Sequence, residues 1–210
     1  MTILTLKSIQ NSCKTNAWGF GNKVLYDLCR KHPSHDEASV VIAKIWLIGR
    51  AYAAAIERRK NREDGDGDFY LENVGPKVSK SKIDNWIRNA SAYRSPSAIS
   101  IPAILDAHIN VTRLFSEISG LEKRSLASKY LHFHKPNLFY IYDTRAVAAM
   151  RRLSGIVGRA ERGDNDFDNE YRKFTYKCIR LRDHIKEEFN ITLCPRQIDN
   201  LLLEIHSKNT

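Results

Sequence analysis

Residues 118–147 constrain the fold more than any other stretch, because they combine a helix end, a glycine turn, a second helix and one isolated carboxylate. Gly120 separates two stretches of helical periodicity, and an apolar run over residues 138–142 follows the second. Asp143 comes directly before the helix-favouring stretch 144–153, where an N-cap belongs. This order predicts a helical hairpin followed by an aspartate that either caps a helix or takes part in chemistry.

Helical periodicity dominates the chain and convincing strand alternation is absent, so we expect an all-α fold. Ser34 and Glu37 have the spacing of a capping box, which would open a long, buried helix reaching to about Arg59. Residues 60–82 are the least helical part and are interpreted as loop. The other main helices are expected near the N-terminus and at residues 21–30, 83–90, 102–118, 125–134, 144–153, 169–190 and 195–205.

The chain has 34 Lys plus Arg against 24 Asp plus Glu, a net charge of +10. Such an excess favours a polyanionic partner over an acidic small molecule, and we expect a nucleic acid. Basic charge that serves only solubility is the alternative. The sequence contains no run of about 18 apolar residues, the length needed to span a membrane. The N-terminus does not have the pattern of a signal peptide, so we expect the protein in the cytosol or nucleoid of a bacterium. We also expect a monomer.

Metal and disulfide chemistry are not expected. The four cysteines are widely spaced and lack C-x-x-C spacing, which indicates reduced, buried thiols: Cys13, Cys29, Cys178 and Cys194. Three histidines also lack a carboxylate at ligand spacing: His108, His132 and His134. We therefore predict no metal and no cofactor.

Residues 119–124 at the hairpin and residues 140–144 around Asp143 resemble the helix-hairpin-helix DNA glycosylase superfamily. Glu122 stands where those enzymes usually have a second hairpin glycine, and Tyr140 where they have a proline. The resemblance implies one compact helical unit over residues 1–210, with a cleft between two lobes. These lobes would be residues 1–35 plus 135–210, and residues 36–134.

The resemblance also implies a glycosylase with double-stranded DNA as its partner. It would flip a modified or damaged base into the cleft and hydrolyse its N-glycosidic bond, with Asp143 as the catalytic carboxylate. Lys129 shares a polar helix face with Ser125, Ser128 and His132, which we expect to point towards Asp143. Lys129 lies deeper along its helix than the superfamily's Schiff-base lysine. We therefore favour a monofunctional hydrolase in which Lys129 pairs within the cleft, with Asp143 as one candidate partner.

The expected pocket residues are those that could contact or stack on an extruded base: Arg50, Tyr52, Tyr140, Tyr142 and His132. The expected DNA-binding residues comprise the hairpin, one arginine after Asp143 and a basic loop: Ser119, Gly120, Leu121, Lys123, Arg124, Arg145, Lys77, Lys80 and Lys82. A buried arginine paired with a structural acid remains the alternative for Arg50. Ordinary solvation remains the alternative for Lys123 and for the basic loop.

Two other functions remain open. The first is a non-catalytic DNA-binding protein that kept the helix-hairpin-helix scaffold. The second is a small all-α interaction module. Within the glycosylase hypothesis, the sequence does not decide between repair and defence against modified phage DNA.

Overall fold

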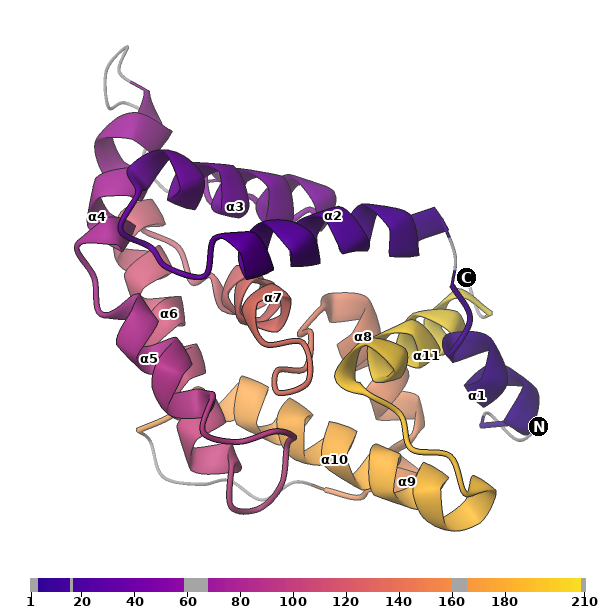
Figure 1. Ribbon diagram of the computed structural model, residues 1–210. Helices are drawn as coiled ribbons and strands as arrows, with labels where there is room; N and C mark the ends of the chain where they lie inside the picture. Colours follow the sequence, from indigo (N-terminus) through magenta and orange to yellow (C-terminus); the bar gives the residue numbers. More distant parts are fainter. Residues whose placement is uncertain (1–3, 16, 59–67, 160–165, 209–210) are drawn as a thin grey trace.

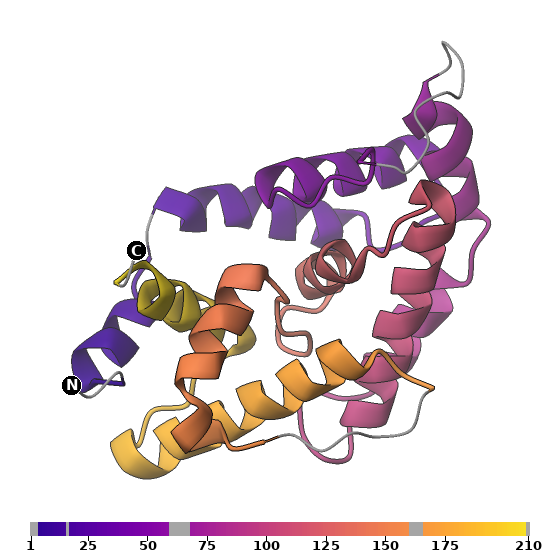
Figure 2. The same cartoon turned by 180° about the vertical axis from the view of Figure 1, so that it is seen from behind.

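The computed structural model describes residues 4–15, 17–58, 68–159 and 166–208, and within these ranges the regular structure is entirely helical (Figures 1 and 2). The all-α prediction is confirmed. The elements in chain order are α1 (Leu6–Ser12), α2 (Ala17–Lys31), α3 (Ala38–Ala51), the π-helical turn η1 (Tyr70–Val74), α4 (Gly75–Ser79), α5 (Ile83–Ala90), α6 (Ile101–Ser119), α7 (Arg124–His134), α8 (Thr144–Arg152), α9 (Ser154–Val157), α10 (Asn169–Phe189) and α11 (Pro195–Ser207).

Two hydrophobic clusters organise these helices. The first is built mainly from α2 to α7, and the second from α1, α8, α10 and α11. Figure 1 shows α2 lying beside α3 and crossing α7, while α8 and α11 pack together on the other side of α7. Leu25 and Cys29 of α2 belong to the first cluster. Helix α2 therefore packs in the same cluster as the helices of residues 36–134.

Helix α3 differs from its prediction at both ends. Its N-cap is Glu37, whose side chain makes no capping bond. The predicted N-cap, Ser34, does not cap the helix, and its hydroxyl donates to Asp36 Oδ1 (2.6 Å). The helix ends at Ala51 rather than near Arg59, since Ala53 has a positive φ of 50° and the Ala54 amide donates to the Gly49 carbonyl (2.8 Å). A Cβ on Gly49 would lie 3.2 Å from the Ala55 Cα, so glycine allows this close reversal.

Two segments in which no helix was expected contain helix. The chain is helical from Tyr70 to Ser79, through η1 and α4, and Tyr70 donates a hydrogen bond to Glu57. Residues 59–67 lie outside the described residues. The short helix α9 begins at Ser154 and extends into the stretch between the expected helices 144–153 and 169–190.

The hairpin and the residue that opens α8 are as predicted. Gly120 ends α6 in the left-handed region with φ 69°, a conformation that favours glycine, and its amide donates to Ser116 O (2.7 Å). Helix α7 begins four residues later at Arg124. Asp143 is the N-cap of α8, and its Oδ1 accepts a hydrogen bond from the Arg145 amide (3.0 Å). The segment that most constrained the fold therefore has its expected local structure.

Candidate functional site

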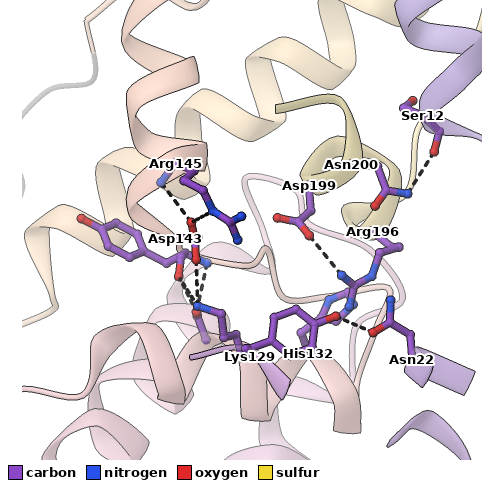
Figure 3. Close-up of polar contacts among 12 residues, drawn as sticks. Ser12, Asn22, Lys129, His132, Asp143, Arg145, Arg196, Asp199 and Asn200 are labelled. Carbon is purple, nitrogen blue, oxygen red and sulfur yellow. Dashed lines mark hydrogen bonds and ion pairs between the residues drawn. The ribbon is translucent and has the colours of Figure 1, made fainter. Parts of the chain in front are cut away.

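Asp143 lies between two cations (Figure 3). Its Oδ2 is 3.3 Å from Lys129 Nζ on α7, and its Oδ1 is 3.2 Å from the Nε of Arg145 in the first turn of α8. The Asp143 side chain is 15% exposed, whereas that of Arg145 is 59% exposed. The carboxylate thus joins a buried amine to a surface guanidinium.

Lys129 is buried and is held by polar groups inside the protein. Its side chain is 1% exposed, and Nζ donates to Ser125 Oγ (2.5 Å) and to the Tyr142 carbonyl (3.4 Å) as well as to Asp143. The Tyr142 backbone amide donates to Ser128 Oγ (3.0 Å). The polar face of α7 therefore points towards Asp143, and Asp143 is confirmed as the partner of Lys129.

The electrostatics favour an ionised pair. Burial alone would raise the pKa of Asp143, but Lys129, the Arg145 amide and the Arg145 side chain together hold it below its ordinary value. Burial lowers the pKa of Lys129, and Asp143 opposes part of that shift. A carboxylate with a lowered pKa at a helix N-terminus is negatively charged at neutral pH.

A second buried ion pair lies beside this group, and the sequence analysis missed it. Arg196 Nη1 donates to Asp199 Oδ2 (3.0 Å), and both side chains are in the first turns of α11, where no site residue was predicted. Burial raises the pKa of Asp199 to about 6, although Arg196 and Lys129 act in the opposite direction. Since Asp143 also contributes to this shift, the two carboxylates interact electrostatically.

Hydrogen bonds connect Arg196 to α7. Arg196 Nε donates to the Tyr26 hydroxyl (3.0 Å), which lies 2.7 Å from His132 Nε2, and His132 Nδ1 lies 2.8 Å from the Phe139 carbonyl. Because a carbonyl can only accept, Nδ1 carries the proton and Nε2 accepts from Tyr26. Burial, together with the nearby Arg196, holds the pKa of His132 well below its ordinary value, in agreement with a neutral ring.

The three tyrosines expected at the pocket have different environments. Tyr52 lies by the second ion pair, with its hydroxyl donating to Asn22 Oδ1 (2.5 Å) and Arg196 near its ring. Tyr142 contributes its carbonyl to Lys129, while its half-buried ring contacts Arg124 and Phe174. Tyr140 is buried in the second hydrophobic cluster, so its ring is not available to stack on a base.

Arg50 does not lie in a buried pocket wall. Its side chain is 58% exposed and pairs with Glu57 (2.5 Å), with the Trp46 ring nearby. The prediction of a buried arginine is wrong because α3 ends one residue later and the chain turns back, which leaves Arg50 at the surface. The alternative that Arg50 pairs with an acidic residue is correct, but Arg50 and Glu57 pair near the surface and not in the core.

The hairpin cations are mostly engaged within the protein. Lys123 is buried, not solvated, and its Nζ donates to the carbonyls of Ala55 (3.2 Å) and Arg58 (2.5 Å). Arg124 pairs with Asp168 through Nε (2.6 Å) and with Glu122. Lys123 therefore secures the chain reversal after α3, and the prediction that it contacts phosphate does not fit its position.

The remaining predicted DNA contacts differ in exposure. Ser119 is buried and its hydroxyl donates to the Phe115 carbonyl (2.8 Å), whereas Leu121 at the tip of the hairpin is exposed. Three lysines around α4 and before α5 are exposed: Lys77, Lys80 and Lys82. These lysines and Arg145 are the predicted cations that can reach a phosphate from their observed positions.

A groove of about 660 Å³ lies between α2, α5 and the C-terminal end of α7. Tyr26 and Phe133 line it, but neither Lys129 nor Asp143 does. This groove is therefore not a cleft at the candidate catalytic carboxylate.

Comparisons with protein-family models, with curated proteins and with solved structures each gave no match to this chain. In the described part of the chain, no helix is long and apolar enough to cross a membrane. Within those same residues, no group of three or more His, Cys, Asp or Glu side chains could hold a metal ion. All four cysteines are free: Cys29 and Cys178 are buried as expected, whereas Cys13 and Cys194 are exposed.

Proposed function

We propose that the chain is a DNA glycosylase of the helix-hairpin-helix type, which extrudes a modified or damaged base and hydrolyses its N-glycosidic bond. One observation carries the proposal: an ionised Asp143 opens α8 beside the buried amine of Lys129, after a hairpin with a left-handed glycine. The net charge of +10 supports a nucleic-acid partner. Two lobes with the site between them would correspond to the two hydrophobic clusters.

The chemistry would use the negative charge of Asp143. As the bond between C1′ and the base nitrogen breaks, the base leaves with the electron pair and the sugar becomes positively charged. Asp143 would stabilise that charge and accept a proton from the water that attacks C1′, while the departing base takes up a proton. Arg145 is exposed, so a DNA phosphate could draw it away from Asp143 Oδ1 and free that oxygen for water.

A broad release assay tests this function. The protein is incubated with modified, damaged and viral DNAs, released bases are identified by mass spectrometry, and abasic sites are revealed by alkali cleavage. Release of a specific base with matching abasic sites supports the proposal. If no base is released from any of these DNAs, the proposal fails.

We expect no covalent adduct between Lys129 and DNA, because Lys129 Nζ is buried and engaged by Ser125, Tyr142 and Asp143. Borohydride treatment during turnover should trap no protein–DNA complex, while alkali-labile abasic sites accumulate. A trapped complex that disappears in Lys129→Ala would show that the enzyme is a lyase as well.

A second candidate, a non-catalytic DNA-binding protein, is favoured by the engagement of both Asp143 oxygens and by the position of the groove away from them. Under either function the exposed lysines should bind phosphates. Replacing Lys77, Lys80 and Lys82 together by alanine should lower DNA affinity. It should also reduce the slope of log affinity against log salt by roughly 1 for each phosphate that the variant no longer neutralises.

Fluorescence anisotropy from low to moderate salt measures this slope. The matched control replaces the lysines Lys173, Lys177 and Lys186 of α10, which lie outside the predicted DNA-binding residues. An equal decrease in both triple variants would show that only total charge matters. Absence of DNA binding by the unmodified protein at low salt would favour the interaction module.

A further inference from the structure

The ion pair between Arg196 and Asp199 contains two buried polar atoms without a partner among the described residues. They are Arg196 Nη2, a donor, and Asp199 Oδ1, an acceptor. The neighbouring atoms of both groups are engaged, since Nε donates to Tyr26 and Nη1 donates to Asp199 Oδ2. The two open atoms therefore belong to groups already joined by a hydrogen bond. Buried polar groups are nearly always paired, so this open donor and acceptor need an explanation.

Their position relates them to the candidate catalytic carboxylate. Figure 3 shows Asp199 between the Asp143–Arg145 group and Arg196. Lys129 and His132 lie one turn apart on α7 and contact Asp143 and Tyr26 respectively. The same face of α7 thus supports both groups.

The surroundings of Arg196 suit a planar ligand. Its guanidinium carbon lies 5.9, 5.6 and 5.5 Å from the ring centroids of Tyr26, Tyr52 and Phe133. The Arg196 side chain is 16% exposed, so one side of the pair approaches the surface, although the two open atoms are themselves buried. Aromatic walls beside a few convergent polar groups are typical of ligand sites.

The donor Arg196 Nη2 and the acceptor Asp199 Oδ1 would together fit a planar ligand whose edge carries an acceptor next to a donor. The Watson–Crick edge of a nucleobase has this arrangement. Enzymes that extrude a base from DNA read that edge by hydrogen bonds inside the site.

We propose that Arg196 and Asp199 bind the Watson–Crick edge of the extruded base, with Arg196 Nη2 donating to a carbonyl oxygen on that edge and Asp199 Oδ1 accepting from the adjacent ring N–H. This inference rests on the proposed function and narrows its substrate class. The base would carry its modification away from this edge. A base methylated on the edge is excluded, because the methyl group replaces the donor and leaves the Asp199 carboxylate unpaired.

Free bases test this recognition without requiring catalysis. Uracil is compared with 3-methyluracil, and hypoxanthine with 1-methylhypoxanthine, by titrating each into ¹⁵N-labelled protein and following the Arg196 Nε–H resonance. Unmethylated bases should shift that resonance at millimolar concentrations. The methylated bases should bind roughly tenfold or more weakly, as expected for loss of a hydrogen bond to a charged group.

Variants assign the discrimination to the pair. Asp199→Asn and Arg196→Lys should each weaken uracil binding and reduce the preference over 3-methyluracil, with thermal unfolding confirming that the variants fold. For Arg196→Lys, backbone amide shifts replace the missing arginine signal. The matched control is Asp183→Asn, which removes the carboxylate of another Arg–Asp pair, on α10 (2.7 Å to Arg182), and should bind like the unmodified protein.

The outcomes separate the two proposals. Equal binding of methylated and unmethylated bases, absence of binding by both, or full discrimination in Asp199→Asn would overturn the recognition by this pair. A clear preference for the unmethylated bases, with no base released from any DNA, would support edge recognition and count against the glycosylase. Base release from DNA without a preference for unmethylated free bases would support the glycosylase and count against edge recognition by Arg196 and Asp199.

Discussion

Asp143→Asn is expected to slow base release from a substrate DNA by roughly 10³-fold, within the range for loss of a catalytic acid or base. The asparagine keeps nearly the same shape and can still cap α8, but it carries no charge to stabilise the sugar and takes no proton from water. DNA affinity should be retained, because one negative charge is removed from a surface that binds a polyanion. Single-turnover release measured by mass spectrometry, beside fluorescence anisotropy for binding, gives both values.

Asp168→Asn is the matched control for this variant. Asp168 is also an N-cap, of α10, and pairs with an arginine, Arg124 (2.6 Å), outside the group around Lys129. It should release bases at the normal rate. If Asp143→Asn kept full activity, or if both variants lost activity equally, Asp143 would act only as a structural cap.

The local part of the candidate site could be predicted from the sequence, because its determinants are close together in the chain. Gly120 ends α6 in a left-handed conformation, and Asp143 precedes a good helix; both depend on neighbouring residues. Lys129 and Ser125 share one face of α7 through helical spacing alone. A lysine on that face needed a partner, and the following loop returns Asp143 to it.

The rest of the site depends on packing between distant segments. Asp199 lies between the buried residues Ile198 and Leu202 on the apolar side of α11, and this is the one sequence signal that could have marked it. Its neighbours Tyr26 and Lys129 come from other helices, so periodicity within α11 could not identify them. Lys123 was misjudged for the same reason, because its acceptors are carbonyls in the turn after α3.

The free energy of unfolding should depend on pH through Asp199, with a sign opposite to that of a typical paired aspartate. Burial raises the pKa of Asp199 from its ordinary 3.8 to about 6, so between these values the native protein binds more protons than the unfolded chain. The free energy of unfolding therefore falls as pH rises through this window. At about 1.4 kcal/mol per pKa unit, the shift of Asp199 corresponds to a total loss of about 3 kcal/mol. The lowered pKa of Asp143 acts below this window, where its stabilisation is lost on acidification.

Urea unfolding of the unmodified protein and Asp199→Asn, at several pH values from 4 to 7, measures this contribution. The stability of the unmodified protein relative to Asp199→Asn should fall with rising pH and level off above about pH 6, the pKa of Asp199. The control variant Asp183→Asn removes a carboxylate that is more exposed than that of Asp199. Its stability curve should stay parallel to that of the unmodified protein. Parallel stability curves for the unmodified protein and Asp199→Asn would show that Asp199 does not titrate in this window. Above about pH 6 the ionised carboxylate also provides the acceptor proposed to read the base, so base binding should increase over the range in which stability decreases.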